Sequence, residues 1–108
     1  MYLPDFSLKG KAAIVTGARR GLGKAIALMF AEAGADVAAC DFVIEDGELE
    51  KVAEEIKGMG WRSLAIKVDV TQKADVEKMV QKVFKEFGHI DILVNNAAIL
   101  GEKTPVLD

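Results

Sequence analysis

The chain has 108 residues, 51% of them hydrophobic, and a formal net charge of −3 at pH 7, which is enough material for one core and one domain. The acidic balance argues against nucleic acid as a partner, and neither a membrane-spanning apolar run nor a signal-peptide layout is present. With one cysteine (Cys40) and one histidine, the sequence predicts no disulfide and no metal site, so we expect a soluble cytoplasmic protein.

Residues 12–34 are predicted to form a strand, a glycine turn and a helix. The apolar run 12–15 leads into Thr16-Gly17, and Gly21 and Gly23 follow before a helix expected from Gly23 to Ala33. Glycine accepts positive φ and lets backbone N–H groups approach a ligand, while the start of the helix favours an anion. The turn therefore predicts a pyrophosphate site. The apolar face of this helix is expected to comprise Leu22, Ile26, Met29, Phe30 and Ala33.

The rest of the chain continues the alternation of strands and helices. Strands are predicted at 36–40, closed by Asp41, at 63–68 and at 90–94, with helices at 47–58 and after a capping Thr71. Such alternation predicts an α/β doubly wound parallel sheet of Rossmann type with strand order 3-2-1-4, and a ligand crevice between Gly17 and Asn95. The buried stripes are expected to be Leu49, Val52, Ala53 and Ile56 in the second helix, and Val76, Met79, Val80, Val83, Phe84 and Phe87 in the third.

Four motifs in this order resemble the short-chain dehydrogenase/reductase family. They are T-G-x-x-x-G-x-G from Thr16, Asp41 after the second strand, Val68-Asp69-Val70 after the third, and Asn95-Asn96-Ala97-Ala98 after the fourth. The resemblance extends over the whole chain but matches only the N-terminal part of a typical member. It implies that residues 1–108 are part of a single NAD-binding Rossmann domain, truncated and without its C-terminal strands.

The resemblance also implies roles for individual residues, each with a simpler alternative. Asp41 would bind the adenosine ribose hydroxyls, or is only a polar strand end; Asp69 and Val70 would hold the adenine, or Asp69 caps a helix. Asn95 would bind neighbouring backbone and so fix the end of the fourth strand, or it only ends that strand as a turn-forming residue. Ala98 stands where the family motif has glycine. The predicted cofactor-binding residues are Gly17, Arg19, Arg20, Gly21, Leu22, Gly23, Asp41, Phe42, Asp69, Val70, Asn95, Ala97 and Ala98.

The cofactor is expected to be NAD rather than NADP. After Asp41 the sequence has Glu45, Asp46, Glu48 and Glu50 before the first basic residue, so a 2′-phosphate would meet like charge there. Arg19 and Arg20 instead favour NADP, because a basic residue just before the second glycine can pair with a 2′-phosphate in relatives. We expect the repulsion to decide, so NADP is the less favoured cofactor.

No catalytic residue is predicted in this chain. The family uses a Tyr-x-x-x-Lys pair and a serine, whereas the only tyrosine here is Tyr2, with Phe6 four positions later. Three hypotheses follow: part of an NAD-dependent dehydrogenase acting on an alcohol or carbonyl substrate, a stand-alone nucleotide-binding or regulatory protein, or an unrelated α/β enzyme such as a methyltransferase. The motif combination favours the first. We also expect a homo-oligomer, with self-association through the edge strand 90–94.

Overall fold

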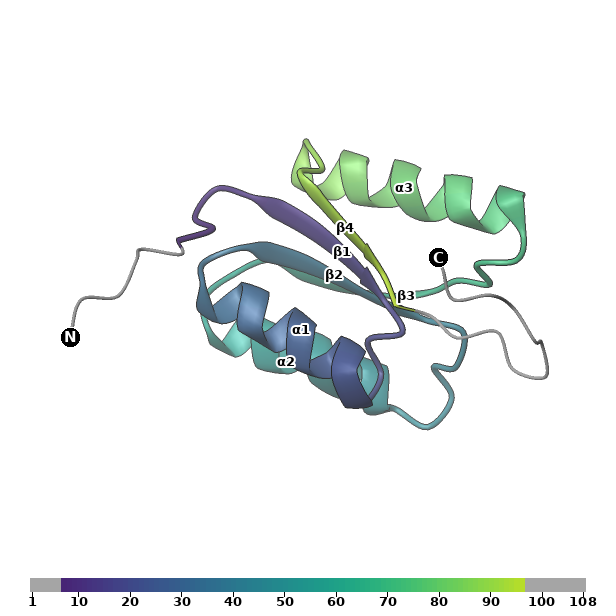
Figure 1. Ribbon diagram of the computed structural model, residues 1–108, viewed down its shortest axis with the longest axis horizontal. Helices are drawn as coiled ribbons and strands as arrows, with labels where there is room; N and C mark the ends of the chain where they lie inside the picture. Colours follow the sequence, from purple (N-terminus) through teal and green to yellow (C-terminus); the bar gives the residue numbers. More distant parts are fainter. Residues whose placement is uncertain (1–6, 97–108) are drawn as a thin grey trace.

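The computed structural model describes residues 7–96, which form a four-stranded parallel sheet with three helices (Figure 1). The strand order is β3-β2-β1-β4, which confirms the predicted topology. Residues Ala97 and Ala98, and the lead-in before Ser7, lie outside the described part. The elements are β1 (Ala12–Thr16), α1 (Gly21–Glu32), β2 (Asp36–Asp41), α2 (Glu48–Gly58), β3 (Ser63–Lys67), α3 (Lys73–Phe87) and β4 (Ile92–Asn95).

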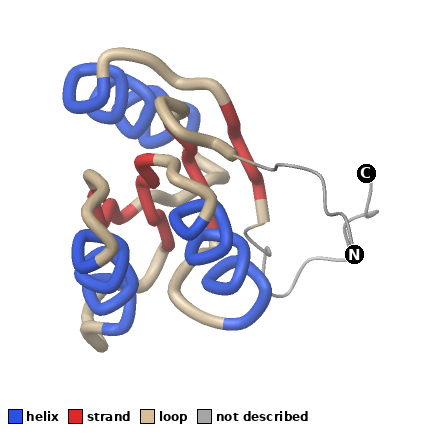
Figure 2. The backbone as a smooth tube through the Cα atoms, turned by 90° about the vertical axis from the view of Figure 1, so that its left-hand side faces the viewer, coloured by secondary structure: helices blue, strands red, loops and turns tan. Residues whose placement is uncertain are grey.

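The sheet separates two apolar layers, with α1 and α2 on one face and α3 on the other (Figures 1 and 2). Side chains alternate along β1 and β2, so Val15 and Val37 pack toward α1 and α2 while Ile14 and Cys40 pack toward α3. Every residue of β1 is buried, as expected for a parallel strand covered on both faces. Burial of the larger side chains of this strand, Ile14 and Val15, contributes about 1.5–3 kcal/mol each, because they leave water.

Helix α2 buries the predicted face, but the face predicted for α1 is only partly correct. Leu22 and Met29 are 67% and 57% exposed, whereas Gly23, Ala27 and Ala31 are the buried residues. Small side chains let the helix axis approach the sheet closely, and the larger Ile26 and Phe30 then pack at the margins of the core. The helix also begins at Gly21 rather than Gly23, and Ala33 is its C-cap.

Helix α3 differs from its prediction at its start and on one side. It begins at Lys73 with Gln72 as N-cap and no capping side chain, so Thr71 does not cap it. Met79 and Val83 are buried as predicted, but Val80 and Phe84 are 36% and 58% exposed. The predicted stripe was therefore too wide, because this helix has only one sheet face to cover within the described residues. Strand β3 ends one residue earlier than predicted, and β4 spans Ile92–Asn95 rather than 90–94.

At the opposite end of the sheet, Arg62 makes two sets of contacts that the sequence did not predict. Arg62 pairs with Asp36 at 2.9 Å and also donates to the carbonyls of Glu86 and Phe87 at the end of α3. These carbonyls are the negative end of the helix, so the guanidinium holds α3 against β2 and β3. No helix among residues 7–96 is long and apolar enough to cross a membrane.

Candidate dinucleotide-binding site

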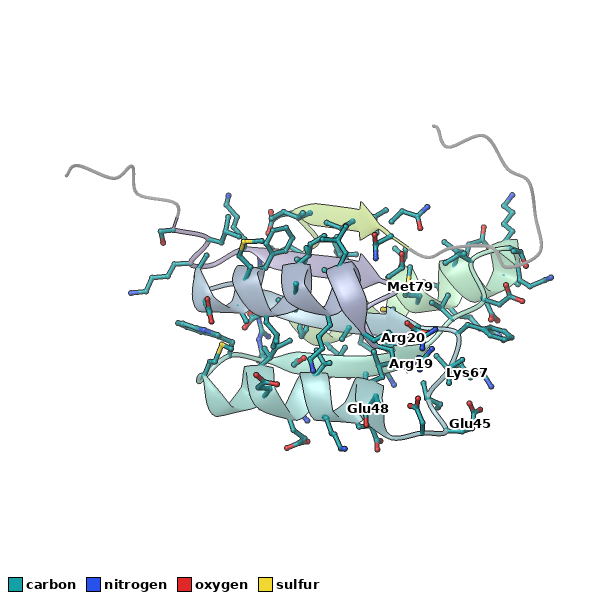
Figure 3. All side chains as sticks on the ribbon, turned by 60° about the horizontal axis from the view of Figure 1, so that its bottom comes forward. Arg19, Arg20, Glu45, Glu48, Lys67 and Met79 are labelled. Atoms are coloured by element: carbon teal, nitrogen blue, oxygen red, sulfur yellow. The ribbon has the colours of Figure 1, made fainter. Side chains whose placement is uncertain are left out.

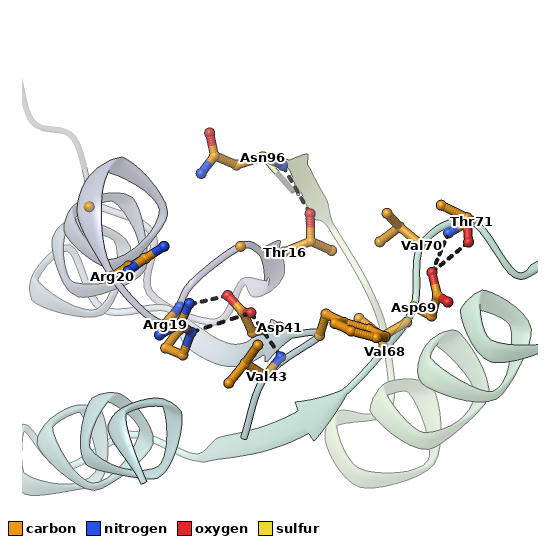
Figure 4. A pocket seen from close by; sticks show the side chains of 13 residues that line it. Thr16, Arg19, Arg20, Asp41, Val43, Val68, Asp69, Val70, Thr71 and Asn96 are labelled. Carbon is orange, nitrogen blue, oxygen red and sulfur yellow. Dashed lines mark hydrogen bonds and ion pairs between the residues drawn. The ribbon is translucent and has the colours of Figure 1, made fainter. Parts of the chain in front are cut away.

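A cavity of about 570 Å³ lies where β1, β2 and β3 end, which is the edge predicted to bind ligand. Figure 3 shows Arg19 and Arg20 at the start of α1, with Glu45, Glu48 and Lys67 on neighbouring segments. Figure 4 gives a close view of the cavity. The residues that line it are Thr16, Gly17, Arg19, Arg20, Gly21, Asp41, Phe42, Val43, Val68, Asp69, Val70, Thr71 and Asn96.

The glycine turn supplies one wall of this cavity. Gly17 and Gly21 have φ angles of +68° and +62°, a region that disfavours other residues. A side-chain carbon at Gly21 would meet no atom within 4 Å, so the backbone there is open to a ligand. Helix α1 starts at this point without a capping side chain and without an acidic residue in its first turn. Its free N–H groups therefore suit an anion such as a phosphate.

Gly23 serves packing rather than the cavity. An added Cβ there would overlap the carbonyl oxygen of Gly17, and it would lie 2.6 Å from that carbonyl's carbon. The first turn of α1 is thereby pressed against the end of β1. Only glycine at position 23 permits this close contact, which keeps the start of α1 next to the turn at Gly17.

Asp41 stands at the end of β2 with its carboxylate already oriented. Oδ2 accepts the backbone N–H of Arg19 at 3.2 Å, and Oδ1 accepts that of Val43 at 3.1 Å (Figure 4). The Arg19 Nε lies 3.6 Å from Oδ1 as an ion pair. Each carboxylate oxygen has a second lone pair, so the group can still accept from a ligand hydroxyl.

The far end of the cavity is apolar. Phe42, Val43, Val68 and Val70 line it, and the Phe42 side chain is 59% exposed. The Lys67 ammonium lies 5.8 Å from the centre of the Phe42 ring. A flat aromatic group of a ligand could be covered by these side chains and by little else in the cavity.

Asp69 forms a local turn beside this apolar end. Its Oδ1 accepts the hydroxyl of Thr71 at 2.6 Å and the backbone N–H of Thr71 at 3.0 Å. The Thr71 hydroxyl, and then its N–H, hold the pKa of the Asp69 carboxyl below its ordinary value. Asp69 is therefore ionised at neutral pH and lines the cavity as an acceptor. The alternative that Asp69 caps the following helix is wrong, because the N-cap of α3 is Gln72 and no side chain caps it.

Strand β4 is tied to β1 through the buried hydroxyl of Thr16. The hydroxyl accepts the backbone N–H of Asn96 at 2.9 Å and lies 3.0 Å from Oδ1 of Asn95, to which it can donate. Thr16 and Asn95 are paired in the sheet register. The side chain of Asn95 is thus engaged with β1, and it is Asn96 that lines the cavity.

Cys40 is not a reactive group of this site. Its side chain is buried among the residues between the sheet and α3. Burial, and to a lesser degree the charge of Asp41, raise the pKa of the Cys40 thiol to about 12. The thiol therefore stays protonated, and no group of three or more metal-ligating side chains occurs within residues 7–96.

The structure brings eight of the predicted residues to one cavity. Leu22, Gly23 and Asn95 do not line it, and Ala97 and Ala98 lie outside the described residues. Five further lining residues were not among the predicted cofactor-binding residues, although each lies in a quoted motif or within two residues of one: Thr16, Val43, Val68, Thr71 and Asn96. Their position next to strand ends was the available signal, because parallel strands end at one edge of a sheet. The eight predicted residues in the cavity are Gly17, Arg19, Arg20, Gly21, Asp41, Phe42, Asp69 and Val70.

Comparison with known proteins identifies the family. A sequence model described as short chain dehydrogenase matches residues 11–108. The short chain dehydrogenase/reductase dpfgG of Gibberella zeae is 41% identical over 94% of this chain, and the 3-oxoacyl-[acyl-carrier-protein] reductase FabG of Staphylococcus epidermidis is 45% identical over 82% of it. The chain spans 37% and 36% of these two relatives.

A solved structure agrees with this assignment. The short chain dehydrogenase from Burkholderia cenocepacia J2315 in complex with NADP superimposes with a TM-score of 0.80 and 42% identity. The alignment covers 85% of this chain and 37% of that one. With the matched motifs, the shared strand order and the cavity at the end of the glycine turn, the chain belongs to the short chain dehydrogenase family.

Proposed function

We propose that this chain is the NAD-binding portion of an oxidoreductase that transfers hydride between NAD(H) and an alcohol or carbonyl substrate. Residues 1–108 would be the N-terminal part of a single Rossmann domain. One observation carries the proposal: a single cavity joins the uncapped start of α1, the oriented carboxylate of Asp41 and an apolar end at Phe42. Phosphate, ribose and adenine need these three surfaces in this order.

The residues present fit the ADP portion of a dinucleotide. The N–H groups at Gly17–Gly21 would bind the pyrophosphate, and Asp41 would accept from the ribose hydroxyls. Phe42 and Val70 would cover the adenine, with Asp69 as an acceptor for its amine. When bound, the nicotinamide ring supplies the hydride chemistry. In this proposal the chain's own residues orient the cofactor and leave proton transfer to other parts of the protein.

The same proposal includes a preference for NAD over NADP. Asp41 lines the cavity where a 2′-phosphate would lie, and Asp46 adds negative charge through its contact with Arg19. The Burkholderia cenocepacia relative was solved with NADP, so membership of the family does not decide the choice. The preference rests on the two carboxylates, Asp41 and Asp46, that surround the single guanidinium of Arg19.

Titration of the chain with three ligands tests the proposal. Because every assigned residue faces the ADP portion, NAD and ADP-ribose are expected to bind with nearly equal affinity, near ~1 mM or about −4 kcal/mol. NADP should bind more weakly, and Asp41→Ala should narrow the gap between NAD and NADP. Amide chemical shifts at Gly21 and Val70 can follow binding. A strong preference for NAD over ADP-ribose would contradict the assigned contacts, and equal or tighter NADP binding would overturn the cofactor preference.

Nucleotide binding without catalysis is a second candidate function. It rests on the cavity alone, whose lining residues fit a dinucleotide and include no Tyr-x-x-x-Lys pair. In the family such a pair moves the proton that accompanies hydride transfer. Formation of NADH from NAD and an alcohol by the 108-residue chain would exclude this second candidate.

We also propose that copies of the chain associate through β4. This strand is one edge of the described sheet, and its Leu93 side chain is 58% exposed. Sedimentation is expected to show concentration-dependent dimers, and Leu93→Lys should weaken them. Ala65→Lys, which places the same charge at an exposed position of the opposite edge strand β3, is the matched control. A stable monomer at high concentration would count against the interface.

A further inference from the structure

The guanidinium of Arg19 is held between two carboxylates from different segments. Nη1 donates to Oδ2 of Asp46 at 2.8 Å, and Nε lies 3.6 Å from Oδ1 of Asp41. The Arg19 side chain is 16% exposed and lines the cavity directly beside Asp41 (Figure 4). Two carboxylates therefore face the guanidinium of Arg19 at the ribose end of the site, and the neighbouring Arg20 lines the same cavity.

Asp46 is held in place from its own side. Its Oδ1 accepts the backbone N–H of Glu48, the first residue of α2, at 3.0 Å. This bond, and more weakly the contact with Arg19, lower the pKa of the Asp46 carboxyl below its ordinary value. Asp46 is thus ionised at neutral pH and anchored to the start of a helix. It does not line the cavity, so its effect on a ligand must pass through Arg19 or through space.

The guanidinium retains capacity for another acceptor. Its Nε is buried and has no hydrogen-bond acceptor among residues 7–96, since the contact with Asp41 is too long for a hydrogen bond. A guanidinium matches phosphate oxygens in a fork, and such charge-assisted bonds are among the strongest polar contacts in proteins. Arg19 and Arg20 both line the cavity; Arg19 is the one beside Asp41, and Asp46 holds its Nη1.

We propose that Asp46 is a specificity-determining residue, which acts by engaging Arg19 and so weakens the contact of that guanidinium with the 2′-phosphate of NADP. The inference rests on the proposed dinucleotide binding and deepens it. Asp41 repels the phosphate directly at the cavity wall. Asp46 acts one contact further out, because its bond to Nη1 fixes the orientation of the guanidinium, so a phosphate that approaches the free Nε must compete with this carboxylate for Arg19.

A double-mutant cycle between Asp46 and Arg19 tests this inference. Asp46→Ser keeps a short acceptor for the N–H of Glu48 but removes the charge and the reach to Arg19. We expect it to raise NADP affinity at least about tenfold while NAD affinity stays within about twofold. In an Arg19→Gln background, Asp46→Ser should change NADP affinity by less than about twofold.

The matched control is Glu48→Gln, which removes the same charge two residues away. Glu48 pairs with Lys51 at 3.1 Å rather than with Arg19, so this variant should leave the ratio of NADP to NAD affinity unchanged. An equal gain in NADP affinity with and without Arg19, or an equal gain in Glu48→Gln, would mean simple repulsion and would overturn the role of Asp46. An unmutated chain that binds no NAD would instead overturn the proposed function, and this inference with it.

Discussion

Replacing Gly23 by alanine is expected to destabilise the fold by about 3 kcal/mol and to abolish NAD binding. The added Cβ would overlap the carbonyl of Gly17 and lie 2.8 Å from the side-chain Nδ2 of Asn96. The Asn96 side chain can turn away, but the backbone carbonyl of Gly17 belongs to the turn that forms the cavity and cannot move without deforming it. A loss of this size is a large part of the 5–15 kcal/mol that is typical of a domain.

Urea denaturation followed by circular dichroism, with an NAD titration of the folded variant, measures both effects. Gly58→Ala is the matched control, because Gly58 lies in the last turn of α2 and an added Cβ would meet nothing within 4 Å. That variant should be neutral or slightly more stable, since alanine favours a helix over glycine. A Gly23→Ala protein with unchanged stability and affinity would show that α1 can shift freely, and the close packing of the turn would then be wrong.

Replacing Thr16 by valine is expected to cost about 2 kcal/mol, because it removes the hydroxyl that joins the ends of β1 and β4. Valine has nearly the same shape, so the apolar packing is retained while the N–H of Asn96 loses its acceptor. The Thr16 side chain is 2% exposed, so water cannot easily replace the lost bond. Because Thr16 and Asn96 both line the cavity, NAD affinity should fall as well.

Thr16→Ser provides the control, since serine keeps the hydroxyl and loses only a methyl group. Hydrogen exchange of the β4 amides should accelerate in the valine variant and stay near the unmutated rate in the serine variant. Equal exchange in all three proteins would refute the claim that this hydroxyl holds β4.

The sequence by itself determined the topology of this protein. Alternating apolar strands and amphipathic helices leave few arrangements, because crossovers between parallel strands are right-handed and each helix must bury its apolar face. The glycine turn could also be predicted from the sequence, since a positive φ and an exposed backbone are local requirements that glycine meets. Helix α2 was predicted to the correct face because its large apolar residues are spaced for one side only, as at Leu49 and Ile56.

Predictions failed where the size of a side chain mattered more than its hydrophobicity. The buried face of α1 consists of glycine and alanine, which periodicity counts as weak signals, while the larger Leu22 and Met29 are exposed. The same reasoning assigned too many residues to the core side of α3, as at Phe84. The distance between a helix and a sheet decides which residues are buried, and that distance is a property of the packed structure.

Only the tertiary structure decided which charges and hydroxyls meet. The acidic segment after β2 contains no cation before Lys51, yet the fold brings Lys67 to Glu45 and Arg19 to Asp46. The last pair is separated by 27 residues, and the bond from Asn96 to Thr16 spans 80. Such partners have no local pattern, because they are set by strand register and by the turn geometry at one edge of the sheet. Most residues of the site could therefore be predicted from the sequence, whereas the contacts proposed to control its cofactor preference could not.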